Sequence, residues 1–233
     1  MNESRIRFSH WLRGDGAELK SELVVVSLTS LIRHLAAIVI GCGLFGFVMG
    51  VWRSPLQGAY TAVKLPAILV LTALGNTLIN GMFAPLLGVE LNLKKTFAAV
   101  LASYSIASLI LAAFAPLIGF LVWNLPPLST VNSANRAHHA LLLVLVIAIA
   151  FAGTAANRRL LTLIRQFSPD DGSALRLLWS WLTINFLLGS QLSWILRPFI
   201  GSPQLVVQFF RSDALHGNFY ATLAHTLKGF FDF

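Results

Sequence analysis

The chain has 233 residues, of which 56% are hydrophobic and only 11% are charged. A composition this apolar excludes an ordinary soluble globular domain. The formal net charge of +8 would indicate a nucleic-acid partner in a soluble protein. We expect no such partner here, because basic residues that flank membrane spans account for the charge. Since Cys42 is the only cysteine, neither an internal disulfide nor a cysteine-based metal site is expected.

Residues 1–34 form a basic and amphipathic segment ahead of the first long apolar run. The stretch RIRFSHWLRG combines arginines with aromatic residues, which suits contact with an anionic membrane surface. The following stretch, Ala17–Ile32, begins amphipathic and becomes apolar. This pattern predicts an interfacial helix on the cytoplasmic side that then turns into the membrane. A plain helical lead-in to the first span is the alternative.

Five apolar runs occupy residues 35–196, and all nine acidic residues lie outside them. The runs are Leu35–Trp52, Leu65–Gly88, Thr96–Trp123, Ala140–Ala156 and Leu177–Leu196. A hydrocarbon core of about 30 Å needs roughly 20 apolar helical residues, and each run is near or above that length. The runs are apolar without a two-residue alternation, which favours helices over a β-barrel. The sequence therefore predicts an all-α, polytopic bundle of five transmembrane helices.

Small residues recur at four-residue spacing in three of the predicted spans. They are Gly46 and Gly50; Ala148, Ala152 and Ala156; and Gly189 and Ser193. Small side chains at this spacing let helices approach closely in a membrane. They predict helix packing, either within one chain or between copies of it.

Polar side chains also occur within the predicted spans. Thr72, Asn76 and Asn80 form a stripe on the second span, and Asn185 and Gln191 lie on the fifth. Such groups join helices through hydrogen bonds. The alternative interpretation is a narrow polar path through the bundle.

Residues 197–233 predict a turn and an amphipathic cap helix on the outer face. The sequence WILRPFIGSP ends the last span, and its prolines and Gly201 favour a rigid turn. Ser212 and Asp213 are expected to cap the helix that follows. Arg197 is predicted to anchor at the interface, or to bind a lipid headgroup or a substrate carboxylate.

The distribution of lysine and arginine predicts the orientation. With a cytoplasmic N-terminus, eleven of these residues fall on the cytoplasmic side and six on the outer side, as the positive-inside rule requires. Trp52, Trp123 and Trp194 then all lie at the outer interface, where aromatic anchors gather. We expect a multi-pass protein of a bacterial inner membrane with its C-terminus outside.

The five-span plan resembles that of Yip1-type membrane proteins. The entry to the second span, Lys64-Leu65-Pro66 followed by leucines and Thr72, is similar to sequences in bacterial relatives of that group. The WxLRPFxGSP element, Trp194–Pro203, with Phe209–Arg211 after it, resembles a recurring element of small bacterial membrane proteins. The resemblance implies five spans with the N-terminus inside and the C-terminus outside.

The sequence contains no motif of a catalytic, cofactor or metal site. We therefore predict a non-enzymatic scaffold or accessory subunit that contacts membrane lipids and other membrane proteins. The alternative is a homo-oligomeric channel or permease with the polar residues along its path. A third hypothesis is a lipid-modifying enzyme that would use Arg197 and the outer histidines, His138, His139, His216 and His225.

Overall fold

The computed structural model describes residues 20–21, 23–126, 131–201 and 206–222, with the backbone alone for 131–135. All the regular structure in this part of the chain is helical, which confirms the all-α class. The long helices are α3 (Leu28–Val51), α4 (Pro55–Leu86), α5 (Leu93–Trp123), α6 (Val131–Arg165) and α7 (Asp171–Leu196). At a rise of about 1.5 Å per residue, even α3 is about 36 Å long.

Four of these helices begin at a side chain that caps the first turn. Ser27, Ser54, Asn92 and Asp170 each accept a hydrogen bond from the backbone N–H three residues later, at 2.9 to 3.1 Å. Such caps satisfy backbone donors that the first helical turn leaves without a partner. The capping side chain in the local sequence therefore determines where each of these four helices begins.

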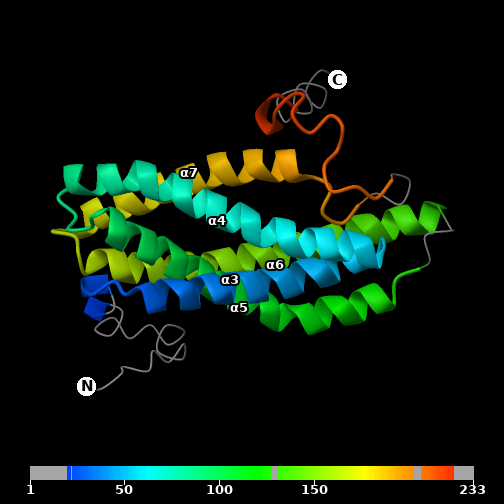
Figure 1. The fold of residues 1–233 in the computed structure, drawn as a ribbon, viewed down its shortest axis with the longest axis horizontal. Coiled ribbons are helices and arrows are strands. Elements are labelled where there is room, and N and C mark those ends of the chain that lie inside the picture. The colour runs from blue at the N-terminus through cyan, green and yellow to red at the C-terminus, as the bar shows by residue number, and fades with distance from the viewer. Residues whose placement is uncertain (1–19, 22, 127–130, 202–205, 223–233) are drawn as a thin grey trace.

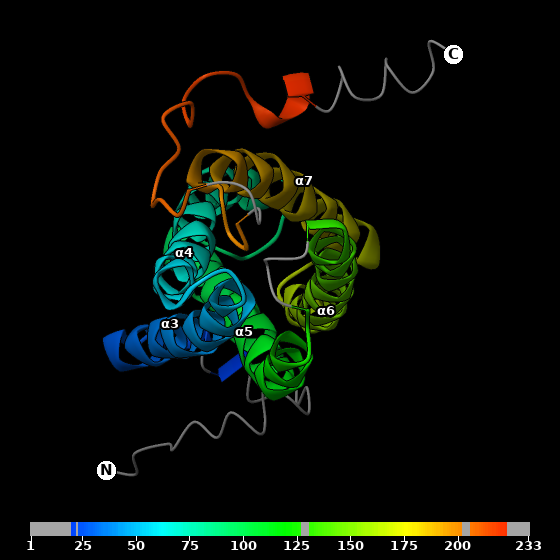
Figure 2. The same ribbon diagram turned by 90° about the vertical axis from the view of Figure 1, so that its right-hand side faces the viewer.

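The five helices run back and forth along one axis, each antiparallel to the one before it (Figure 1). In the end-on view they form a ring, in the order α7, α4, α3, α5 and α6 (Figure 2). The tightest pairs are α3 with α4 and α3 with α5, whereas α6 and α7 meet over a smaller area. The ring is thus closely packed on the α3 side and looser on the α6–α7 side.

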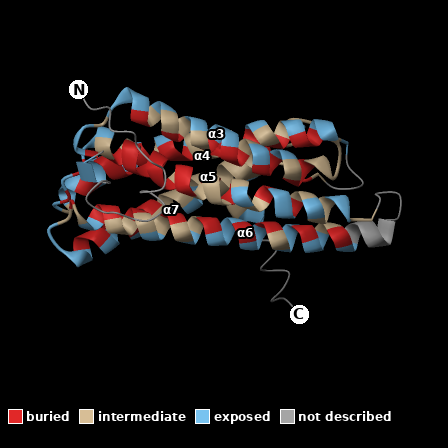
Figure 3. Ribbon diagram, turned by 90° about the horizontal axis from the view of Figure 1, so that it is seen from below, coloured by how far each residue is buried: buried red, intermediate tan, exposed pale blue. Residues whose placement is uncertain are grey.

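The outer surface of the bundle is apolar. Large side chains such as Ile40, Leu78, Phe120, Val146 and Phe186 are exposed, and exposed strips follow the helices along their length (Figure 3). Large exposed apolar surfaces mark contact with a membrane or a partner. The helices α3, α4, α5 and residues 136–165 of α6 are long and apolar enough to cross a membrane.

The predicted fifth span corresponds to α7, which lies beside the other helices (Figure 1). Asn185, Gln191 and several serines interrupt the leucines of α7, and α7 is not among the helices that are long and apolar enough to cross a membrane. Four helices that suit a membrane are therefore established by length and composition.

The terminal segments differ in detail from the sequence-based predictions. The expected helix over Ala17–Ile32 is interrupted at residues 25–27, and α3 begins at Leu28. In the tail, Ser212 and Asp213 lie in a turn rather than at a helix start. The cap is instead Asn218, whose side chain accepts from the backbone N–H of Ala221. Helix follows over residues 219–222, and the rest of the predicted cap helix lies outside the described residues.

The C-terminal part of α6 contributes to the interior of the bundle. Its side chains Leu160, Leu163 and Ile164 are buried. They belong to the same core as Leu177 and Trp181 of α7. The apolar face of this stretch therefore packs inside the bundle.

Candidate functional site

A chain of amide side chains joins two buried residues of α4 to a half-buried residue of α7. The Asn76 side-chain NH₂ group donates to Asn185 Oδ1 at 2.5 Å and to the Trp181 carbonyl oxygen at 3.1 Å. Asn80 donates to Asn76 Oδ1 at 3.0 Å. Tyr104 of α5 donates its hydroxyl to the same Asn185 oxygen at 2.7 Å. Three helices are thus held together by one hydrogen-bond network.

Two other members of the predicted polar path lie outside this network. The Thr72 hydroxyl is buried and has no hydrogen-bond partner in the described chain. Gln191 lies nearer the end of α7, where its Oε1 accepts from the backbone N–H of Phe219 at 3.3 Å. The structure therefore brings Asn76, Asn80 and Asn185 together and leaves Thr72 and Gln191 apart.

The glycines of the first span lie directly against α4. A Cβ atom on Gly46 would lie 2.7 Å from the Thr61 carbonyl oxygen, and one on Gly50 would lie 2.7 Å from the Gln57 carbonyl oxygen. Contacts this close require glycine, because any side chain would force the backbones apart. These residues pack helices within one chain.

The other small residues occupy two different environments. Ala148, Ala152 and Ala156 of α6 are at most 4% exposed and belong to the hydrophobic core. Gly189 and Ser193 of α7 instead line a cavity. A Cβ on Gly189 would meet only Thr72 Oγ1, at an ordinary distance of 3.9 Å.

Polar side chains of α4 bind the turn that follows α7. Gln57 Nε2 donates to the carbonyl oxygens of Pro198 and Phe199, at 3.0 and 2.7 Å. The Thr61 hydroxyl donates to the Phe199 oxygen at 2.6 Å, and Lys64 Nζ donates to the Pro198 oxygen at 3.0 Å. We call Gln57, Thr61 and Lys64, with the two carbonyls that they bind, the tail lock.

Lys64 is fully buried. Besides the Pro198 oxygen, its ammonium group faces the rings of Phe199 and Phe209, at 6.0 and 4.9 Å from their centroids. The negative faces of aromatic rings attract a cation. A carbonyl and two rings therefore hold this lysine against the tail. The sequence interpretation missed its role, although the spacing of residues 57, 61 and 64 places all three on one helix face.

The predicted interfacial residues fall into different surroundings. Trp52 stacks on His138, Trp123 is 89% exposed, and the Arg197 guanidinium lies 3.7 Å from the centre of the Trp194 ring. An aromatic side chain at the end of a span suits the membrane interface.

Arg197 also binds within the tail. Its Nη1 donates to the Trp194 carbonyl oxygen at 2.7 Å, and its Nη2 lies 3.2 Å from Asp213 Oδ2. Arg211 binds the other oxygen of Asp213 at 3.0 Å. Desolvation acts to raise the pKa of Asp213, but the two guanidinium groups lower it below its ordinary value. Asp213 therefore stays ionised and ties the tail to the end of α7.

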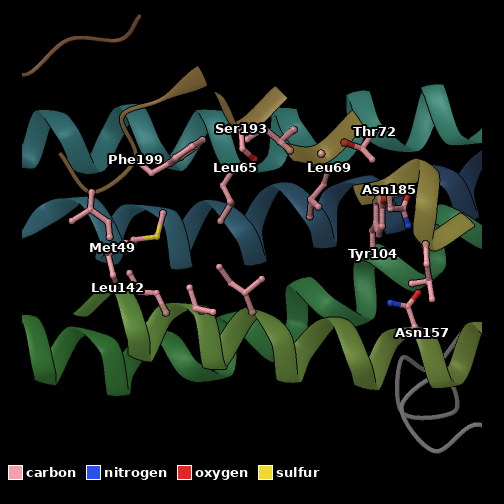
Figure 4. A pocket seen from close by; sticks show the side chains of 17 residues that line it. Met49, Leu65, Leu69, Thr72, Tyr104, Leu142, Asn157, Asn185, Ser193 and Phe199 are labelled. Atoms are coloured by element: carbon pink, nitrogen blue, oxygen red, sulfur yellow. Dashed lines mark hydrogen bonds between the residues drawn. The ribbon is translucent and has the colours of Figure 1, made fainter. Parts of the chain in front are cut away.

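A cavity of about 470 Å³ lies between the helices, and we call it the central groove. Its walls are mostly apolar side chains, and Figure 4 shows Leu65, Leu69 and Thr72 of α4 on one side with Leu142 and Asn157 of α6 on the other. Asn185 and Tyr104 lie close together at one end, and Met49 and Phe199 lie at the other (Figure 4).

A second cavity of about 260 Å³, which we call the basic pocket, lies at the end of the bundle where the turn after α7 begins. Its lining includes His138, Arg197 and Arg211, together with Leu142 and residues 198–201.

No cluster of three or more histidine, cysteine or carboxylate side chains occurs among the described residues. His138 and His139 lie side by side, with ring centres 6.0 Å apart, whereas His225 lies outside the described residues. The central groove is lined mostly by apolar side chains, and such sites bind small apolar molecules.

The fold of the described residues defines the class: an all-helical bundle in which four helices are long and apolar enough to cross a membrane. Comparisons with known protein families, with curated proteins and with solved structures found no match.

Proposed function

We propose that the protein is a non-enzymatic scaffold or accessory subunit of a bacterial inner membrane. In this proposal α7 is a fifth span, the N-terminus is cytoplasmic and the tail is on the outer face. The scaffold contacts lipids through its apolar outer surface and another membrane protein through its tail.

The observation that carries the proposal is the tail lock. Gln57, Thr61 and Lys64 are buried in α4, and all three donate hydrogen bonds to the carbonyls of Pro198 and Phe199. A buried ammonium group is unfavourable unless it is well compensated. The buried ammonium group of Lys64 is compensated by the tail, so it fixes the tail on the bundle. A tail held in one position can be presented to a partner protein.

The polar network supports the scaffold over the channel alternative. Asn76, Asn80 and Asn185 are bonded to one another and to neighbouring helices. Amides engaged in this way stabilise helix packing. A conducting path would instead need polar groups that are available to a hydrated solute.

Native mass spectrometry of the protein extracted gently from its own membrane tests the proposal. We expect a complex of one chain with a different membrane protein. Lys64→Met should keep the bundle folded and reduce the amount of that complex, because the tail loses one of its attachments. Lys94→Met changes an exposed lysine at the start of α5 and serves as the matched control. A defined homo-oligomer that contains no other protein, and that conducts ions in liposomes, would overturn the proposal in favour of a channel.

A further inference from the structure

The central groove and the basic pocket share three lining residues, which makes them neighbouring parts of one site. Leu142, Phe199 and Ile200 line both cavities. One molecule can therefore place an apolar part in the groove and a polar part in the pocket.

The basic pocket carries an excess of positive charge. Arg197 and Arg211 line it, and the Arg53 side chain packs against Gly201 at its edge, with Cγ 3.1 Å from the position of a Cβ on that glycine. Asp213 is the carboxylate that pairs with Arg197 and Arg211 in the described chain. Arg197 and Arg211 thus contribute two positive charges against the one negative charge of Asp213. Guanidinium groups bind phosphate oxygens through charge-assisted hydrogen bonds.

The central groove suits an acyl chain in length and in polarity. Along α6 it extends from Leu142 to Asn157, a rise of about 22 Å at 1.5 Å per residue. One leaflet of a bilayer contributes about 15 Å of hydrocarbon. The wall is not wholly apolar, because it also holds the Thr72 hydroxyl, which has no hydrogen-bond partner among the described residues.

We propose that the central groove and the basic pocket together bind one anionic phospholipid. Its phosphate lies in the basic pocket and binds N–H groups of Arg197 and Arg211 other than those that contact Asp213. One acyl chain lies in the groove between α4, α6 and α7. This inference rests on the proposed insertion in a membrane. Lipid binding is measured on the isolated chain, so its failure is distinguishable from the failure of the scaffold role, which is measured by recovery of a partner.

The test is native mass spectrometry of the delipidated full-length protein in detergent, titrated with dioleoyl phosphatidylglycerol or dioleoyl phosphatidylcholine. These lipids share their acyl chains and differ in headgroup charge. We expect one molecule of phosphatidylglycerol to bind, about tenfold more tightly than phosphatidylcholine, because only the former carries a net negative charge for the arginines.

Two variants with matched controls locate the site. Gly189→Leu fills the groove and should weaken phosphatidylglycerol binding by about tenfold or more. Ala140→Leu adds bulk at an exposed position of α6 that does not line the groove, and should leave binding unchanged. Arg211→Gln removes a charge from the pocket and should weaken binding several-fold. Arg136→Gln removes an exposed charge from α6 and should not.

Three outcomes would overturn the proposal. Equal effects of Gly189→Leu and Ala140→Leu would show that the lipid binds the outer surface generally. Equal affinity for the two lipids, unaltered by Arg211→Gln, would exclude a role for the basic pocket. Full competition by glycerol 3-phosphate, which has the anionic group without acyl chains, would show a site for soluble anions. Thermal unfolding of each variant identifies any loss of binding that comes from misfolding.

Discussion

Replacement of Asn76 by leucine tests whether the polar network holds the bundle together. Leucine has nearly the same shape as asparagine but cannot form hydrogen bonds. The change removes the bonds from Asn76 to Asn185 and to the Trp181 carbonyl, and the bond that Asn76 accepts from Asn80. An interhelical hydrogen bond in a membrane contributes about 0.6 kcal/mol on average, so three bonds give about 2 kcal/mol. We expect the free energy of unfolding to fall by that amount.

The assay is reversible unfolding of the purified protein in mixed micelles, followed by circular dichroism. Asn157→Leu is the matched control, because Asn157 bonds only the Gly153 carbonyl of its own helix among the described residues. We expect it to change the free energy of unfolding by less than about 0.5 kcal/mol. The reasoning would be refuted if the two variants unfolded alike. If Asn76→Leu abolished solute flux and left the free energy of unfolding unchanged, the channel would be favoured instead.

Three further predictions concern helix packing, the tail lock and a helix cap. Gly46→Ala should destabilise the bundle by about 1 to 3 kcal/mol, because the added methyl group forces α3 away from α4. Gly153→Ala is the control and should not destabilise it, since a Cβ there meets nothing within 4 Å. Chemical unfolding of the two variants makes the comparison. Lys64→Met should speed hydrogen exchange of the backbone amides next to Pro198, and unchanged exchange would contradict the tail lock. Ser173 donates hydrogen bonds to the Asp170 carboxylate from its side chain and from its backbone N–H. These two bonds, the side-chain one first, lower the pKa of Asp170 below 3.8. Its stabilisation is therefore present above pH 3.8 and lost as the pH falls through the lowered pKa. The stability difference between wild type and Asp170→Asn should shrink over that acidic range, and a difference independent of pH would exclude the cap.

The helical class could be predicted from the sequence because the apolar runs are long and lack alternation. Helix ends were harder to predict, since they depend on single capping side chains. Ser27 and Ser54 begin α3 and α4 well before the apolar runs at Leu35 and Leu65. Polar residues such as Gln57 and Thr61 were excluded from a span by hydropathy, yet they lie in the helix and are buried.

The candidate site was only partly predictable for a related reason. The stripe of Asn76 and Asn80 was visible in the sequence, because its spacing follows one helix. The partners of that stripe on α5 and α7, and the contact of Lys64 with the tail, join residues 81 to 134 positions apart. Contacts of that range depend on how the helices pack. The spacing of residues along the sequence does not reveal these contacts between helices.

The side of the membrane on which the tail lies is the measurement that tests the proposed five-span protein most directly. Cys42 is the only cysteine, so Cys42→Ser provides a background for single cysteines introduced at two exposed positions, Ser212 in the tail and Lys94 after α4. We expect a membrane-impermeant maleimide to label Ser212→Cys in intact cells, and Lys94→Cys only after the membrane is permeabilised. Labelling of both positions from the same side would show that α7 does not cross, and would contradict the five-span topology.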